Sequence, residues 1–497
     1  MEVKFNQNTL SCLQMVVSGV QKLEQTLELR LPEGYPDIGR ILGCWGQVLL
    51  RGKEWRSSGM SANAGVMAWV LYAPEDGSSP RVVDAWIPFS CKWDFPEPVD
   101  DGLMTMQPLL TDLDGRGTSA RKIMLRACVD MMGQAMIPSK AQIPVPDTLP
   151  EDVYLRRESY PVELPMEGGE KQMQMERLLN LPDTPGSHKV ISASLKPQVQ
   201  EQKLVANRLI FRGEATLHLR YIHEDGSLGT WQTQIPFSQY VELDRDYGAQ
   251  ASAWLEPVVT ALELTAEDNG QMSMKAGVAA QYLIFDRSVL EMVTDAYSPC
   301  REVGVQEGVL TLPMLLDMRT VDVNVQGTTE ELGSPGDIAP MPAYPALRQG
   351  DDGTDIRMDG HFQILARDGE GQLRMESVPF TGSVPFPSAA ENRTQLWVGP
   401  GSVPTLSPGA GGSVIQCGYP VTAMVYSGQP ISVVVRLELG ELKPLDPDRP
   451  SIILRRAGEE DLWTMAKCCG STVEAIQKAN QLQQEPEKGQ MLLIPVC

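Results

Sequence analysis

One pattern of strands and turns occurs three times along this chain. In each copy a glycine precedes alternating apolar residues, an acidic turn follows, and the next strand ends in proline and phenylalanine. The closing phenylalanines are Phe89, Phe237 and Phe380, with spacings of 148 and 143 residues. Such a period is that of a whole domain, because solenoid repeats recur every roughly 20–50 residues. The chain is therefore predicted to contain three related domains.

The repeated pattern predicts antiparallel β-structure. Alternating apolar side chains, as in Ala215, Leu217 and Leu219, place one face of a strand towards a core. An Asp-Gly pair, as at Asp76-Gly77, supplies the positive φ that reverses the chain in a hairpin. The proline before the closing phenylalanine has no amide hydrogen, so that strand is expected at a sheet edge or a bulge. With 42% hydrophobic and 21% charged residues, the composition is that of a globular protein.

Two segments carry a helical spacing of apolar residues instead. Residues 9–27 repeat them at intervals of three and four, and a shorter helix is predicted from Glu170 to Leu179. A Leu-Pro pair follows each segment, at Leu31-Pro32 and Leu181-Pro182, and proline does not continue a helix. We therefore expect the first two repeats to begin with a helix. Residues 328–349 are rich in glycine and proline, which predicts a loop at the start of the third repeat.

Residues 451–497 predict the order strand, helix, helix, strand. A short apolar run opens the segment, and the spacing of Leu462, Met465 and Ala466 predicts one apolar helix face. Gly470 ends that helix, a serine or threonine directly after it can cap a second one, and another apolar run closes the segment. A unit of this size has a small core, which is typical of a binding module.

This last segment resembles a LysM domain. The residues that carry the resemblance are Gly458, Leu462, Trp463, Ala466, Gly470, Thr472, Val473, Ile476, Asn480, Leu482, Gly489, Gln490, Leu492, Ile494 and Pro495. The resemblance implies a βααβ fold that binds polymers containing N-acetylglucosamine in a shallow groove. On this sequence the groove residues would be Gly458, Glu459, Glu460, Asp461, Leu462, Leu482, Gln483, Glu485 and Pro486.

The groove sequence departs from the pattern Gly-Asp-Thr-Leu-Trp of many LysM domains. Residues 458–463 instead read Gly-Glu-Glu-Asp-Leu-Trp, which is one residue longer and has three consecutive acids. Carboxylates accept hydrogen bonds from sugar hydroxyls, but they also suit a basic protein surface. A glycan and a docking protein therefore both stay open as partners. The indole of Trp463 is expected to pack in the core.

Residues 31–42 read LPEGYPDIGRIL. Together with the Asp-Gly hairpins, the Pro-Phe strands and the C-terminal segment, they resemble the SPOCS-domain spore morphogenesis proteins (SipL-like) of endospore-forming bacteria. The expected fold is mainly β with minor α. It has three antiparallel SPOCS-like repeats at 1–145, 146–300 and 301–445, the third diverged, and a small βααβ LysM domain at 451–497.

The resemblance implies a non-enzymatic scaffold or adaptor of spore coat assembly. It would act in the mother-cell cytoplasm at the forespore surface, and its LysM domain would dock a coat morphogenetic protein, such as an ATPase-type protein of the basement layer, or a glycan. The alternative is a cell-wall-associated protein that binds peptidoglycan. The N-terminal residues lack the layout of a secretion signal, which favours the scaffold because intact peptidoglycan lies outside the cytoplasm.

Composition argues against several other classes. The chain has 42 basic and 64 acidic residues, and its net charge of −22 repels nucleic acid and anionic membranes. No apolar run approaches the ~20 residues that span a bilayer, so no direct membrane insertion is expected. Nine cysteines without a CxxC pair, and only four histidines, argue against a structural zinc site.

Catalytic motifs are missing from the sequence. It contains no phosphate-binding GxxxxGKS or GxxxxGKT loop, no HExxH and no GxSxG. Residues 351–355 resemble the start of a calcium loop, but Phe362 stands where the twelfth-position glutamate is needed. The acids before Trp463 could suggest a glycosidase, yet a shallow groove does not enclose a substrate between two carboxylates. The chain is predicted to bind no cofactor and not to be an enzyme, with an unrecognised hydrolase in the repeats as a minor alternative.

Overall fold

The structure is a computed structural model. It describes residues 2–180, 189–222, 228–267, 271–329, 334–350, 353–367, 373–409, 412–444 and 449–496. The strands in these segments pair in antiparallel fashion, and the two helices found there both lie near the C-terminus. The prediction of a mainly β fold with minor α is confirmed. Gly77 has the expected positive φ of 72°, whereas the hairpin turns at 225–226 and 368–369 lie outside the described residues.

The first two repeats have the same topology. In each, the first, last and fifth strands form one three-stranded sheet, and the second, third and fourth form another: β2-β7-β6 and β3-β4-β5, then β8-β13-β12 and β9-β10-β11. The strands of the first repeat are β2 (Phe5–Arg30), β3 (Ile38–Arg56), β4 (Gly59–Pro74), β5 (Arg81–Asp94), β6 (Leu103–Ser119) and β7 (Lys122–Pro146). Those of the second are β8 (Tyr154–Leu179), β9 (Lys189–Val205), β10 (Arg208–Ile222), β11 (Leu228–Glu242), β12 (Ser252–Ala266) and β13 (Met272–Tyr297).

The third repeat keeps this order, but its first, second, fifth and last strands are each divided in two. A single pairing, Gln326 with Thr381, joins its two sheets into one. The strands are β14 (Arg301–Leu310), β15 (Leu315–Thr329), β16 (Ser334–Pro342), β17 (Ala346–Gly350), β18 (Gly353–Arg367), β19 (Leu373–Pro385), β20 (Arg393–Val398), β21 (Thr405–Gly409), β22 (Gly412–Tyr426) and β23 (Ile431–Leu442).

The two predicted N-terminal helices are wrong, since residues 9–27 belong to β2 and residues 170–179 to β8. β2 pairs with β7 along its whole length, so a partner strand satisfies its backbone groups. A bulge between Met15 and Val17 moves later side chains to the other face, and the apolar spacing then imitates a helix. The loop predicted at 328–349 is also wrong where the structure describes it, because β16 and β17 lie there.

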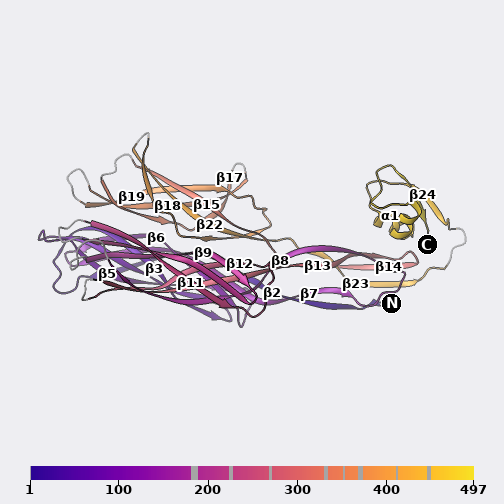
Figure 1. Ribbon diagram of the computed structural model, residues 1–497, viewed down its shortest axis with the longest axis horizontal. Coiled ribbons are helices and arrows are strands. Elements are labelled where there is room, and N and C mark those ends of the chain that lie inside the picture. Colours follow the sequence, from indigo (N-terminus) through magenta and orange to yellow (C-terminus); the bar gives the residue numbers. More distant parts are fainter. Residues whose placement is uncertain are drawn as a thin grey trace.

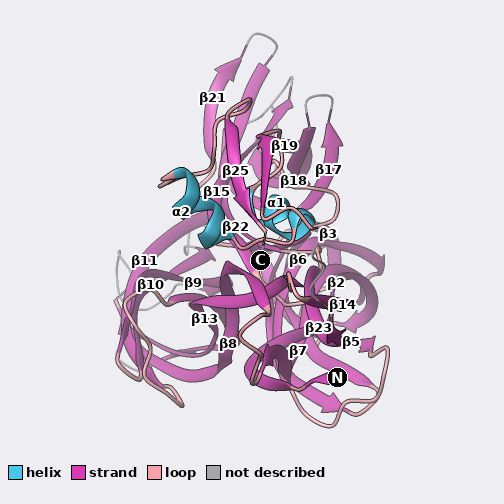
Figure 2. Ribbon diagram, turned by 90° about the vertical axis from the view of Figure 1, so that its right-hand side faces the viewer, coloured by secondary structure: helices cyan, strands magenta, loops and turns pink. Residues whose placement is uncertain are grey.

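The paired first and last strands of each repeat continue beyond the sheets as two-stranded ribbons. Figure 1 shows β2 with β7, β8 with β13, and β14 with β23 extending together to the right. One apolar core joins these ribbons, and Cys12, Leu164, Met292, Leu310 and Val433 are among its buried residues. Figure 2, which looks along this direction, shows the repeats as three lobes around a common centre. β1 (Glu2–Val3) pairs with β23 and attaches the first repeat to the third.

Glutamine side chains join the repeats by hydrogen bonding to edge strands of a neighbouring repeat. The amide of Gln281, in β13, accepts a hydrogen bond from the N–H of Met106 and donates one to its C=O, both at 2.8 Å. Gln107, in β6, makes the same two bonds with Val398 of the third repeat, at 3.0 and 2.8 Å. Met106 and Val398 lie on edge strands, where no neighbouring strand bonds their outer N–H and C=O groups. The glutamine amide takes the place of that missing strand, so these groups are not buried without partners.

A small module lies beyond the ribbon ends (Figure 1). β24 (Ile452–Arg456), α1 (Leu462–Cys469), α2 (Val473–Asn480) and β25 (Met491–Pro495) follow in the predicted order. Gly470 ends α1 in the left-handed conformation and the Thr472 hydroxyl caps α2. The core of the module consists of Ala457, Leu462, Met465, Ala466, Ile476, Leu492 and Ile494.

In the second and third repeats, an aromatic ring lies over the glycine that begins the repeated pattern. A Cβ atom on Gly213 would lie 2.7 Å from the ring of Phe237. One on Gly360 would lie 2.6 Å from the ring of Phe380, and closer still to the carbonyl oxygen of Met341. Because real Cβ atoms do not approach other atoms so closely, these positions leave no room for a side chain.

Gly360→Ala is expected to lower the free energy of unfolding by about 1–3 kcal/mol, because the added methyl group overpacks the sheet. The matched control is Gly52→Ala in β3, since nothing lies within 4 Å of a Cβ atom at Gly52. Urea unfolding followed by circular dichroism measures both variants. Equal unfolding midpoints for the two would contradict the packing argument.

Candidate functional site

The two loops predicted to line the groove are held together by their own residues. The Asp461 carboxylate caps α1, because it accepts hydrogen bonds from the N–H (2.9 Å) and the hydroxyl (2.6 Å) of Thr464. These bonds hold the pKa of Asp461 below its ordinary value. The buried Leu462 donates its N–H to Glu485 Oε2 at 3.0 Å, which connects the loop before α1 to the loop after α2.

Each acid of the 459–461 run already has a basic partner in the chain. The ion pairs, with their N···O distances, are Glu459 with Lys488 (2.6 Å), Glu460 with Arg455 (2.5 Å) and Asp461 with Arg156 (2.8 Å). Of the other predicted groove residues, Gly458 and Gln483 are exposed, and Leu482 and Pro486 are partly buried. The structure thus brings the two loops together, and ligand binding between them stays a prediction.

The sheet of the module carries exposed apolar side chains on the face away from its helices, and sequence reasoning missed them. Helices α1 and α2 cover one face of the two-stranded β24–β25 sheet, where Leu492 and Ile494 are buried. An exposed outer patch on the other face consists of Ile452 (57% exposed), Leu454 (63%), Met491 (49%) and Leu493 (45%). Leu454 lies directly opposite Leu493 in the register, so these side chains are neighbours. The sequence did contain a sign of this patch. Both short strands have apolar residues on both of their faces, whereas the two helices can cover only one face of the sheet.

The module packs against the end of the ribbon from the second repeat. Asp295 of β13 accepts hydrogen bonds from the Trp463 indole (2.8 Å) and the Lys467 ammonium (2.7 Å). The Trp463 ring meets the Tyr297 ring edge-on at a centroid distance of 4.7 Å. Burial alone would raise the pKa of Asp295, but the bonds from Lys467 and Trp463 hold it below its ordinary value. Trp463 therefore contributes to the contact between module and ribbon.

This contact is expected to weaken in acid. Because the pKa of Asp295 is lowered in the docked state, its carboxylate stabilises docking above the ordinary value of 3.8, and the contribution is lost as the pH falls through the lower docked value. Asp295→Ala should release the module already at pH 7, which small-angle X-ray scattering detects as a larger radius of gyration. Glu291→Ala, an exposed acid on the same strand, is the control. Identical scattering from Asp295→Ala and the wild type at pH 7 would count against this contact.

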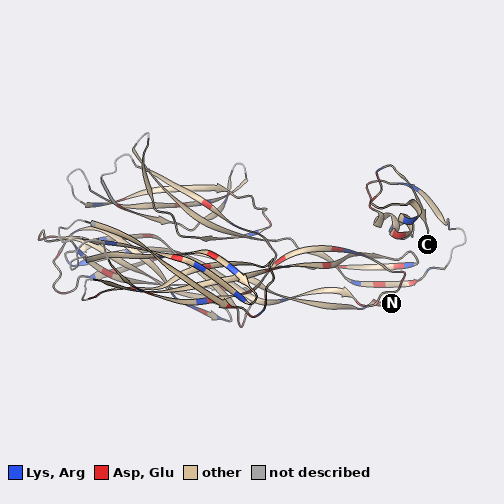
Figure 3. Ribbon diagram, viewed as in Figure 1, with Lys and Arg blue, Asp and Glu red and all other residues tan. Residues whose placement is uncertain are grey.

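The part of the chain that the structure describes also bears on other kinds of site. No group of three His, Cys, Asp or Glu residues there could hold a metal ion. None of its helices is long and apolar enough to cross a membrane. The eight cysteines placed in it are all free. Asp351 and Asp352 of the calcium-like segment lie outside it. Acidic and basic residues are interleaved along the strands (Figure 3).

Comparison with known protein families matches one part of the chain. The family described as SipL, SPOCS domain matches residues 188–264, which include β9, β10, β11 and most of β12. No curated protein and no solved structure matches the chain. The chain is therefore similar to this family over residues 188–264 of the second repeat, and the first repeat has the same strand order as the second.

Proposed function

We propose that this chain is a non-enzymatic scaffold of spore envelope assembly, and that its C-terminal LysM-like module docks a coat morphogenetic protein. The similarity of the second repeat to the SipL, SPOCS domain family supports a role in sporulation. The module lies at the far end of the ribbons, away from the main sheets of the three repeats, where a partner can reach it (Figure 1). The proposed place of action is the mother-cell cytoplasm at the forespore surface.

The outer patch of the module is the observation that carries the docking proposal. Single exposed apolar residues are ordinary, whereas a contiguous apolar patch is a feature of interaction sites. A sugar polymer instead needs free hydrogen-bonding groups, and the three acids of the predicted groove are engaged by Lys488, Arg455 and Arg156. The proposed occupant is an ATPase-type protein of the coat basement layer, and peptidoglycan is the competing ligand.

The test compares binding of the full-length chain to a purified coat ATPase and to insoluble peptidoglycan. Leu454→Ser combined with Leu493→Ser removes the centre of the outer patch, and Leu178→Ser, at an exposed position of β8, is the matched control. We expect the double variant to bind the ATPase at least tenfold more weakly, since truncating a central interface side chain costs about 1–2 kcal/mol or more. Binding to peptidoglycan alone, or ATPase binding that survives the double substitution, would contradict the proposal.

A further inference from the structure

A cavity of about 1140 Å³ lies where the three repeats meet. Each repeat contributes two edge strands to its wall, β3 and β6, β9 and β12, and β16 and β20, and residues of β10, β11, β15 and β22 complete it. Edge strands carry unpaired N–H and C=O groups that tend to pair with other strands. Prolines such as Pro108, Pro257 and Pro340 remove donors from these edges. The edges of different repeats therefore do not form a common sheet, and a space is left between them.

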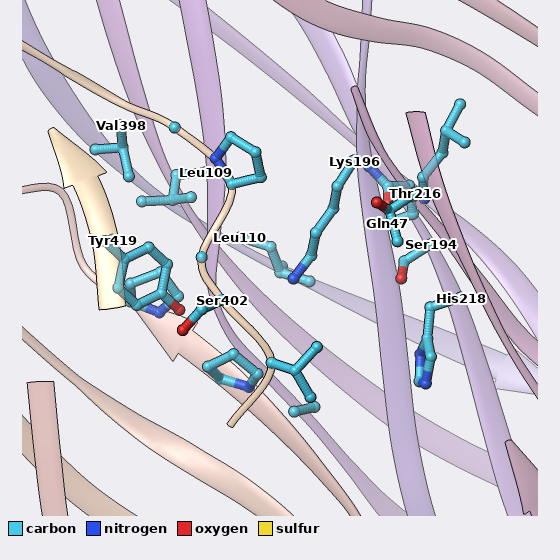
Figure 4. A pocket seen from close by; sticks show the side chains of 18 of the residues that line it. Gln47, Leu109, Leu110, Ser194, Lys196, Thr216, His218, Val398, Ser402 and Tyr419 are labelled. Carbon is cyan, nitrogen blue, oxygen red and sulfur yellow. Dashed lines mark hydrogen bonds between the residues drawn. The ribbon is translucent and has the colours of Figure 1, made fainter. Parts of the chain in front are cut away.

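Lys196, on β9, extends into this cavity (Figure 4). Ser194, Thr216 and His218 lie on the same side, and Tyr419 of the third repeat lies across from them. Among the described residues, no ion pair or hydrogen bond engages the Lys196 ammonium. Lys196 is exposed to solvent within the cavity, so its amino group is accessible to an anion that enters.

The neighbouring charges do not compensate Lys196. Arg220 is already neutralised by Asp337 at 2.6 Å. Burial raises the pKa of Glu256 to about 8, so this carboxyl is mainly protonated at neutral pH. Burial likewise lowers the pKa of His218 to about 4, which leaves a neutral imidazole able to donate one hydrogen bond. The pKa of Lys196 is itself lowered by desolvation, and a bound anion would relieve that cost.

The rest of the wall suits an apolar body. Leu109, Leu110 and the edge prolines Pro257 and Pro340 are only partly buried and give the wall its apolar surface. Cavities of several hundred cubic ångströms hold organic molecules, whereas a single inorganic ion needs far less space. We propose that the cavity binds a small organic carboxylate, which pairs with Lys196 and lays its apolar body against Leu109, Leu110 and the prolines. This site goes beyond the scaffold function and does not depend on the outer patch of the module.

Calorimetric titration of the full-length chain with benzoate tests the proposal. We expect Lys196→Gln to weaken benzoate binding at least tenfold, because the charge that pairs with the carboxylate is lost. Lys203→Gln is the matched control, since Lys203 is exposed on the same strand and does not line the cavity. Benzamide, which lacks the charge, and inorganic phosphate, which lacks the apolar body, should each bind at least tenfold more weakly than benzoate.

Three results would overturn the proposal. One is the absence of benzoate binding to the wild type, and another is equal benzoate affinity in the wild type and Lys196→Gln. The third is binding of benzamide or phosphate as tight as that of benzoate. Thermal melting distinguishes a lost site from a lost fold. The melting temperature of Lys196→Gln should equal that of the wild type, because the substitution breaks no ion pair or hydrogen bond among the described residues.

Discussion

Asp337→Ala is expected to destabilise the protein by about 3–5 kcal/mol, because it leaves the charge of Arg220 buried without a partner. The two side chains are only 11% and 10% exposed. Arg220 also donates a hydrogen bond to Ser192 and lies over the Trp45 ring, contacts it would lose by turning out to water. Since the ion pair joins β10 of the second repeat to β16 of the third, the junction of these repeats should weaken with it.

Urea unfolding measures this effect, with Glu242→Ala as the matched control. That substitution breaks an ion pair with Arg208 in which both side chains are more than half exposed, so we expect a loss below about 1 kcal/mol. Replacing both Arg220 and Asp337 by leucine should recover much of the stability, because no unpaired charge is then buried. A loss from Asp337→Ala no larger than that from Glu242→Ala would refute the prediction.

Glu256→Gln is expected to stabilise the protein at alkaline pH and to change little in acid. Burial raises the pKa of Glu256 from 4.5 to about 8. Between these two pH values the Glu256 carboxyl is protonated in the folded chain and ionised in the unfolded chain. The stability of the folded protein therefore falls as the pH rises through this window. The difference between the two pKa values corresponds to at most about 5 kcal/mol. Glutamine carries no charge at any pH and removes this loss.

The substitution should fit the site, since a glutamine, Gln107, stands before the corresponding proline of the first repeat. Gln107 Nε2 donates to Glu256 Oε1 at 2.5 Å, and a glutamine side-chain oxygen can accept the same bond. Thermal melting of both proteins at pH 5 and pH 9 is the measurement. The melting temperature of the variant should exceed that of the wild type clearly at pH 9 and only slightly at pH 5. The same difference at both values would show that the Glu256 carboxyl does not titrate in this range.

Several errors of sequence reasoning arise from contacts between distant residues. The apolar spacing in residues 9–27 is compatible with a helix, and the choice of a strand depends on β7, which begins at Lys122. The acids at 459–461 look free in the sequence, but one of them pairs with Arg156 of another repeat. The outer patch could have been found, because two apolar strand faces cannot both be covered by the module's own helices.

Local sequence patterns were sufficient to predict the threefold repeat, the β character and the order of elements in the C-terminal module. Hydrophobic alternation, glycine turns and the caps of short helices act within a few residues, so they are visible before folding. Three features became visible only in the folded chain: which sheet edges meet, that Arg220 is paired while Lys196 is not, and which apolar strand face is left uncovered. These outcomes depend on contacts between residues far apart in the chain, such as the 117 positions between Arg220 and Asp337, and no local pattern encodes them.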